Sequence, residues 1–398
     1  MKKRIGCIML LAVSLFISGC GKSFDAPALE STGVSVPEIS LEEKTIPENS
    51  ALSFVEGMKI GWNLGNTFDA TGTQADELLN ESMWCGAVTT EEMILSVKAA
   101  GFNTLRLPVS WHDHVDADYN ISEVWLNRVQ EVVDYAYKNG MYIILNIHHD
   151  AEKNYCYPTY EKLDQSKKYI EKIWQQLSAK FNGYDSHLIF EGMNEPRLKG
   201  TSNEWWIDAN SDVGAEAIDC INQLNQLFVT TVRASGGNNS ERYLMVPSYC
   251  ASADFTCIDS FILPTDTVEN KLIVSVHAYT PYNFALQAPT ESSSMDEFSV
   301  DKLQHTHLIT QLMENLYNTF ISKGIPVVIG EFGSRSKDNL EARVQHAAYY
   351  IAAAKACGIT CCWWDNNAYT SGESFGLFDR TAMEWRYSDI VIAMMKYC

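Results

Sequence analysis

From residue 51 onward, short apolar runs alternate with longer amphipathic stretches without a sustained interruption. The stretches between the runs have helical periodicity, as in 122–139 and 163–181, although the interval 250–270 is irregular and predicts only a short helix. Eight strands that alternate with helices form a closed parallel sheet more readily than an open one. The pattern therefore predicts one (β/α)8 barrel over residues 51–398. Its expected strands are 58–64, 102–107, 141–147, 187–193, 243–246, 272–276, 326–330 and 359–364.

Two of the apolar runs lead into a glutamate, Glu195 after 188–193 and Glu331 after 326–330. The carboxyl ends of the strands are where a barrel of this kind keeps its reactive groups. Two carboxylates in one cleft suit the cleavage of a glycosidic bond, since one protonates the leaving oxygen and the other attacks or stabilises the anomeric carbon. Either glutamate alone could instead cap a strand and pair with a surface cation. We interpret them together as a catalytic pair.

Polar and aromatic residues also follow or end the other strands. Arg106 lies inside an apolar run, where a cation is costly unless it meets a carboxylate. Trp364 is expected to face the site and Trp363 to point away, because neighbours on a strand alternate. The candidate binding residues at this rim are Asn66, Asp69, Arg106, His148, His149, Asn194, His277, Tyr279 and Trp364.

The pair His148-His149 raises the question of a metal, because histidines at strand ends can bind zinc. Adjacent strand residues point to opposite faces, and no third ligand is evident in the sequence. We therefore expect no metal and no cofactor.

The strings GWNLGNTFDA, RLPVSWHDHVD, LNIHHD, FEGMNEPR, HAYTPYNFAL, IGEFGS and WWDN resemble glycoside hydrolase family 5, and within it subfamily 4. The resemblance covers roughly residues 51–398 in order. It implies a retaining endo-β-1,4-glucanase that acts on plant cell-wall glucans, with Glu195 as acid/base and Glu331 as nucleophile. It also implies that Arg106, His148, Asn194, His277, Tyr279 and Trp364 surround the sugar at the point of cleavage, and that His149, Asn66 and Asp69 make further contacts.

Other functions are compatible with parts of the pattern. The same site could act on xyloglucan, mixed-linkage glucan or mannan. A glycan-binding protein on an inactive barrel and a metal-dependent hydrolase are alternatives from other classes, which the two glutamates and the missing third ligand disfavour.

The residue types also predict how the site is charged. Arg106 and the Tyr279 hydroxyl are suited to hold Glu331 ionised, and Asn194 can donate to a sugar 2-hydroxyl. Glu195 must start protonated, so we expect the charge of Glu331 to raise the pKa of Glu195.

The first 20 residues predict export. A basic start at 2–4 and an apolar stretch at 5–17 precede Ser18-Gly19-Cys20, which resembles a bacterial lipobox. We expect Cys20 to be acylated, which places the protein at the cell surface and on a membrane only through its lipid anchor. An ordinary cleaved signal and secretion are the alternative. Residues 21–50 are rich in Ser, Pro, Glu and Thr and predict a flexible linker.

Composition limits the partners. The formal net charge of −20 disfavours nucleic acid and anionic membranes, but a neutral polysaccharide is compatible with it. Beyond Cys7 and Cys20, the chain holds an odd number of cysteines without a regular framework, so we assign no disulfide, although Cys250 and Cys257 could pair. We expect a monomer.

Overall fold

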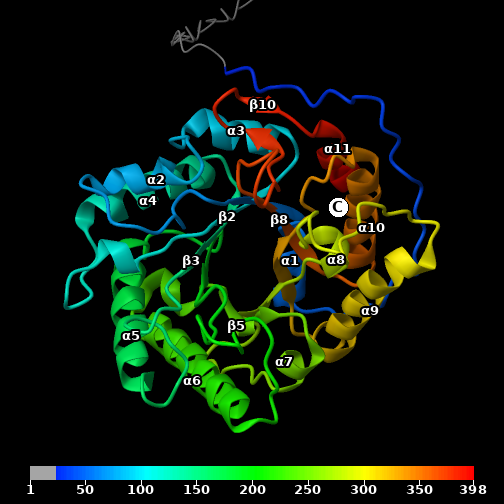
Figure 1. Cartoon of the computed structure of the whole chain (residues 1–398). Helices are drawn as coiled ribbons and strands as arrows, with labels where there is room; N and C mark the ends of the chain where they lie inside the picture. Colours follow the sequence, from blue (N-terminus) through cyan, green and yellow to red (C-terminus); the bar gives the residue numbers. More distant parts are fainter. Residues whose placement is uncertain (1–23) are drawn as a thin grey trace, which may run out of the picture.

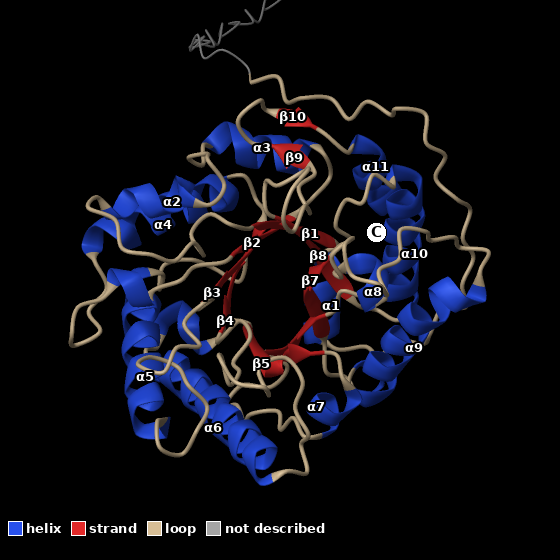
Figure 2. Ribbon diagram, viewed as in Figure 1, coloured by secondary structure: helices blue, strands red, loops and turns tan. Residues whose placement is uncertain are grey.

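The computed structural model describes residues 24–398, in which eight parallel strands close into a barrel inside a ring of helices (Figure 2). Each strand pairs with its neighbours in chain order, and the first pairs with the last. The predicted (β/α)8 barrel is confirmed. The strands are β1 (Ile60–Leu64), β2 (Thr104–Leu107), β3 (Tyr142–Asn146), β4 (Leu188–Glu191), β5 (Leu244–Ser252), β6 (Leu272–His277), β7 (Val327–Phe332) and β8 (Thr360–Asp365).

The helices lie outside the barrel, except for the first, which lies beneath it (Figure 1). The irregular interval 250–270 contains the end of β5 and one short helix, the five-residue α7, as expected. The sequence pattern did not predict α1, α2, α8, α11 or a small hairpin of β9 (Phe378–Asp379) and β10 (Glu384–Trp385). The α-helices are α1 (Ser50–Gly57), α2 (Asn80–Met83), α3 (Glu91–Ala99), α4 (Glu123–Lys138), α5 (Leu163–Lys180), α6 (Asp212–Ala234), α7 (Phe255–Asp259), α8 (Tyr282–Ala285), α9 (Leu303–Thr319), α10 (Leu340–Ala356) and α11 (Ser388–Tyr397).

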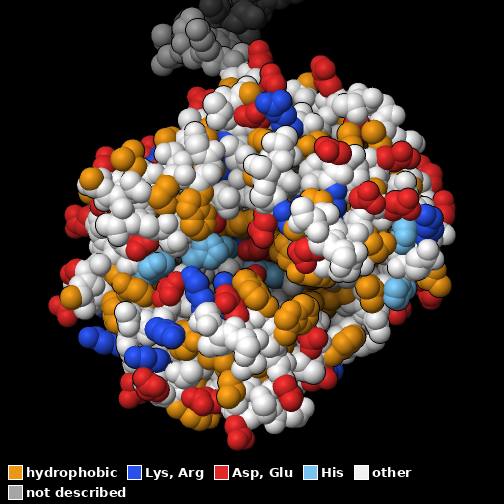
Figure 3. Space-filling model, viewed as in Figure 1, with side chains coloured by type: hydrophobic (Ala, Val, Ile, Leu, Met, Phe, Trp, Pro, Cys, Tyr) orange, Lys and Arg blue, Asp and Glu red, His pale blue; other side chains and the backbone are white. Residues whose placement is uncertain are grey.

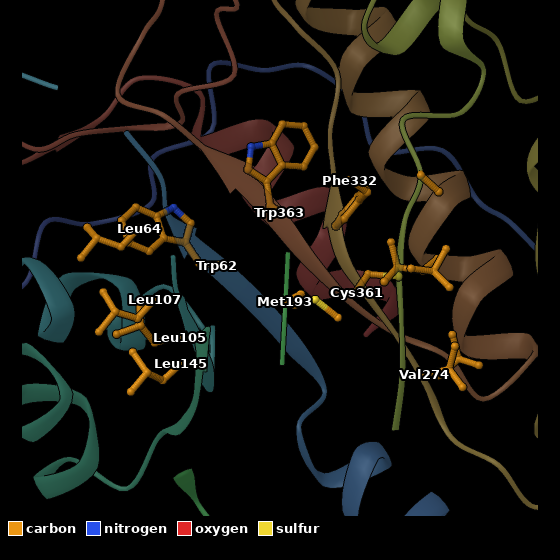
Figure 4. Packing of buried hydrophobic residues seen from close by; sticks show 14 of the residues in the cluster. Trp62, Leu64, Leu105, Leu107, Leu145, Met193, Val274, Phe332, Cys361 and Trp363 are labelled. Carbon is orange, nitrogen blue, oxygen red and sulfur yellow. The ribbon is translucent and has the colours of Figure 1, made fainter. Parts of the chain in front are cut away.

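Strand alternation sorts the side chains into two cores. Leu105 and Leu107 belong to the large cluster between strands and helices, part of which Figure 4 shows. A second cluster, to which β3 to β8 contribute Ile144, Ile189, Met245, Ile273, Val328 and Cys362, contains Ala51, Val55 and Met58 of the α1 region. Because apolar side chains and α1 fill one end of the barrel, its polar interior residues gather at the other end, where the strands finish.

Residues 24–49 form neither helix nor strand, yet they differ from the flexible linker expected for 21–50. They run along the outside of the barrel past α11 and α10 (Figure 1). Ser31 and Thr32 donate hydrogen bonds to Asp389, and the Lys44 amide donates to the Ala356 carbonyl at 2.8 Å. Spaced apolar residues also pack on the core, and they are Leu29, Val34, Val36, Ile39, Leu41 and Ile46. The predicted signal segment 1–20 and Cys20 lie outside the described residues.

The nine cysteines of the described chain are all free thiols, seven of them buried. The possible pair Cys250–Cys257 is therefore not formed. None of the helices in residues 24–398 is long and apolar enough to cross a membrane.

Candidate active site

Two carboxylates meet in a hollow at the centre of the barrel, where Figure 3 shows acidic and histidine side chains together. Glu331 belongs to β7, and Glu195 lies four residues beyond the end of β4. One oxygen of each carboxylate and a ring nitrogen of His277 lie within 4.8 Å of one another. A carboxylate pair this close suits a retaining glycosidase, in which the two carboxyl groups lie about 5–5.5 Å apart, better than an inverting one, in which they lie about 6.5–9.5 Å apart.

Glu331 is 5% exposed and held at both oxygens. Nη1 of Arg106 lies 2.8 Å from Oε1, and the Tyr279 hydroxyl donates to Oε2 at 2.9 Å. Burial and the charge of Glu331 hold the pKa of Tyr279 well above its usual range, so the phenol stays a donor. The arrangement expected for Arg106 and Tyr279 is present.

Arg106 is fully buried, and its guanidinium is surrounded by acceptors. It donates to Asn63 Oδ1 at 2.9 Å and to Asn194 Oδ1 at 2.7 Å. The second contact orients the Asn194 amide so that its nitrogen remains available to donate to a sugar hydroxyl. A Cβ on Gly330 would lie 3.3 Å from Nε of Arg106, so glycine at this position leaves room for the guanidinium.

Glu195 is bonded to cationic groups rather than facing only Glu331. Nδ1 of His277 lies 2.8 Å from its Oε1, and Nη1 of Arg197 lies 3.4 Å from its Oε2. Burial raises the pKa of Glu195, but the hydrogen bond and charge of His277 and the charge of Arg197 outweigh burial and lower it to about 2. The expectation of a raised pKa is therefore wrong for the free protein, because it left out both cations.

His277 shows the complementary shift. Burial lowers the pKa of His277, but the charges of Glu331 and Glu195 raise it more. Nε2 of His277 lies 3.3 Å from Nη2 of Arg106, which can only donate, so Nε2 is the acceptor there and Nδ1 carries the proton that His277 donates to Glu195. Glu195 is a carboxylate in the free protein and must take up a proton before it can act as an acid.

An aromatic wall lies beside the carboxylates. The His148 and Trp364 rings are parallel within 2°, with centroids 5.8 Å apart. A Cβ on Gly65 would lie 2.8 Å from the Trp364 ring, so the close approach of these chains requires glycine. As alternation predicted, Trp363 points away, fully buried, and donates from its indole to the Phe375 carbonyl at 3.0 Å.

The three further candidate contacts lie next to this wall. Asp69 is fully buried, and its Oδ2 has no hydrogen-bond partner among the described residues. Nε2 of His149 is 3.8 Å from that oxygen, and burial lowers the pKa of His149 to about 4, so the ring is neutral. Asn66 is partly exposed, with a left-handed φ of 57° just past β1.

The structure does bring a third possible metal ligand to the histidines, because Asp69, His148 and His149 place ligand atoms within 4.8 Å. The alternation argument fails here because β3 ends at Asn146. The residues nevertheless do not fit a metal. The Asn146 amide nitrogen faces Nδ1 of His148 at 3.1 Å, and its oxygen accepts a backbone N–H. Nδ1 is therefore the acceptor, so Nε2 carries the proton and cannot ligate.

Sequence reasoning missed two charged residues of the site, Glu191 and Arg197. Glu191 is fully buried at the end of β4 and bonded to Arg106. Its signal was present, because it is a charge inside an apolar run, the same feature that pointed to Arg106. Arg197 gave no comparable signal, because it lies in a polar loop.

A (β/α)8 barrel with two carboxylates at this spacing is the fold and site of a retaining glycoside hydrolase. Residues 64–370 match the cellulase family, glycosyl hydrolase family 5. The chain belongs to this family, as its motifs indicated.

Named relatives agree. The chain is 41% identical to endoglucanase A of Clostridium longisporum over 376 residues, which are 92% of this chain and 69% of that protein. It is 55% identical, with a TM-score of 0.90, to a mutant family 5 lichenase from Caldicellulosiruptor sp. F32 solved with cellotetraose, covering 92% of this chain and 99% of that one. A broad-specificity endoglucanase of subfamily 4 from Ruminococcus champanellensis, solved with cellotriose, is 46% identical with a TM-score of 0.80, and the match covers 88% of this chain and 100% of that one.

Proposed function

We propose that this family 5 hydrolase is an endo-β-1,4-glucanase that acts by double displacement, with Glu331 as nucleophile and Glu195 as acid/base. The observation that carries the proposal is the asymmetry of the pair. Glu331 is held by the Arg106 guanidinium and the Tyr279 hydroxyl, whereas Glu195 accepts a hydrogen bond from Nδ1 of His277.

In the first step, an oxygen of Glu331 attacks the anomeric carbon while Glu195 gives its proton to the leaving oxygen. The glycosidic bond breaks, and an ester joins Glu331 to the sugar. Glu195, now a carboxylate, takes a proton from water, which attacks the same carbon and releases Glu331. Asn194 donates to the 2-hydroxyl in both steps, and Trp364 offers its face to the sugar ring.

Each carboxylate can be tested separately. Glu331→Ala should lose turnover on every glucan and regain it with azide or formate, giving a product of inverted configuration, because the small anion replaces the nucleophile. Glu195→Ala should retain cleavage of aryl glucosides with good leaving groups, which need no acid. Near-normal activity of both variants on natural glucan would refute the assignment.

We also propose that the enzyme cuts within chains and accepts several β-glucans, including xyloglucan and mixed-linkage glucan. Exposed indoles next to residues of the site support a cleft that a polymer crosses. Trp84 is 44% exposed, with its ring centroid 5.8 Å from that of His149, and Trp205 is 52% exposed and packs on Arg197. The long loops 70–88, 152–160, 198–212 and 282–299 border this rim.

The measurement is product analysis on a panel of purified polysaccharides, with viscosity followed in parallel. Rapid loss of viscosity on soluble β-1,4-glucan, together with activity on xyloglucan and mixed-linkage glucan, is expected. Release of one short product with viscosity nearly unchanged would show that the loops close the cleft.

A further inference from the structure

Arg106 lies between two carboxylates, only one of which faces the cleft. Nη1 of Arg106 is 2.8 Å from Oε1 of Glu331. On its other side, Nε and Nη2 are 2.9 and 2.7 Å from Oε2 of Glu191. Because Glu191 is fully buried in the barrel, it cannot contact a bound sugar.

Glu191 is itself locked in place. Besides the two nitrogens of Arg106, the Asn146 amide donates to Oε2 at 3.0 Å and the Ser275 hydroxyl donates to Oε1 at 2.5 Å. Glu191 forms a buried ion pair with the guanidinium of Arg106, which is always a cation. The Arg106–Glu191 pair is thus close to neutral, and Glu331 receives one hydrogen bond from a cation whose charge is already largely balanced.

We propose that Glu191 is a positioning residue that sets the reactivity of Glu331 through Arg106. Without Glu191, the full charge of the guanidinium would act on Glu331 and stabilise the carboxylate against both protonation and attack on carbon. With Glu191 present, Arg106 orients the nucleophile without suppressing its nucleophilicity. This inference rests on the proposed role of Glu331.

Other groups also face these carboxylates. Cys362 of β8 is a buried thiol near both, and burial raises its pKa to about 12, so it is neutral. The remaining groups lie near Glu331, and they are His148, Tyr279, His277, Glu195 and Asp69. His277 also lies 3.3 Å from Nη2 of Arg106.

The test is the pH profile of kcat/KM on soluble β-glucan, because its acid limb reports the free enzyme's essential base. Glu191→Gln keeps the shape of the side chain and removes its charge. We expect the acid limb to move to lower pH by about one unit and kcat to fall about tenfold or more. Ser275→Ala removes one donor from Glu191 but leaves its charge, so more of that charge acts on Arg106. We expect a smaller shift of the limb to higher pH.

Asp266→Asn is the matched control. It neutralises a carboxylate that Arg233 holds at 2.7 Å, at the C-terminal end of α6 and the opposite end of the barrel. This variant should lose stability without moving the acid limb, as would be expected of a purely structural ion pair.

Opposite shifts in Glu191→Gln and Ser275→Ala would establish the proposal. If Glu191→Gln does not fold, the direction in which the acid limb moves in Ser275→Ala tests the proposal alone. An acid limb that stays at its wild-type pH in every folded variant overturns the proposal, even if stability falls. Failure of the function itself would look different, because the wild type would then be inactive on β-glucan or Glu331→Ala would remain active.

Discussion

Individual buried carboxylates differ in this protein according to the donors around them. Glu191 has donors at both oxygens, and Asp389 is bonded to Ser31 and Thr32. Asp69, equally buried, has a hydrogen bond to the Thr67 amide at Oδ1 and no partner at Oδ2. The same side-chain chemistry therefore stabilises the fold at one position and opposes it at another.

Asp69 gives a stability prediction. Burial raises the pKa of Asp69 to about 7, above its ordinary value of 3.8. Because the folded pKa is the higher one, ionisation opposes folding, and the cost grows between about pH 4 and pH 7. Asp69→Asn cannot ionise, so we expect it to match the wild type in urea unfolding near pH 4 and to be more stable by on the order of 2–4 kcal/mol at pH 8.

Asp389→Asn is the control of opposite sign. Burial raises the pKa of Asp389, but the hydrogen bonds from Ser31 and Thr32 lower it by more than burial raises it. The folded pKa of Asp389 therefore lies below its ordinary value. The stabilisation that ionised Asp389 gives to the fold is present at neutral pH and is lost as the pH falls through the folded pKa. Asp389→Asn should therefore be less stable than the wild type at pH 8. The prediction would be contradicted if Asp69→Asn and the wild type had the same free energy of unfolding at every pH.

At the level of elements, the extended segment 24–49 fastens α11 to the barrel. The Tyr397 hydroxyl accepts from the Ile39 amide at 2.9 Å and donates to the Pro37 carbonyl, while Asp389 binds the segment at the other end of the helix. The segment forms no strand, but hydrogen bonds along its backbone and the packing of its apolar side chains on the core fix its position.

This attachment predicts an effect of Asp389→Ala. The change removes the bonds to Ser31 and Thr32 and a favourable charge in the first turn of α11. We expect a loss of about 1–3 kcal/mol in unfolding free energy, with faster amide exchange over 29–46. Lys396→Ala is the contrasting variant, because its pair with Glu38 is largely exposed and should contribute little. Equal exchange in wild type and Asp389→Ala would show that the segment is held elsewhere.

At the level of the whole molecule, charge and targeting constrain where the enzyme works. A net charge of −20 is compatible with a neutral polysaccharide but repels anionic surfaces. An acyl anchor would hold the protein at a membrane despite this charge. We propose that Cys20 carries that anchor.

The location has its own test. Cys20→Ala should leave the membrane fraction or accumulate as an uncleaved precursor, while a chain starting at residue 24 should keep full specific activity. Wild-type protein found wholly in the medium, with its N-terminus away from Cys20, would refute the lipoprotein proposal.

Several parts of the fold and site could be predicted because they depend on local pattern. The apolar runs produced all eight barrel strands, and alternation correctly separated Trp364 from Trp363. β5 was predicted too short, because Pro247 and Ser248 resemble a strand end, whereas the structure continues through Cys250 and Ala251, both at positive φ, to Ser252.

The sequence by itself determined the barrel, the family and the two glutamates, because strand periodicity and motif order are written along the chain. Only the tertiary structure decided how the site is charged. Glu191 is 140 residues from Glu331, and they share one guanidinium only after the barrel closes. The same closure brings His277 to Glu195 and reverses the expected pKa shift. Electrostatic interactions depend on distance in space, which the order of residues does not give.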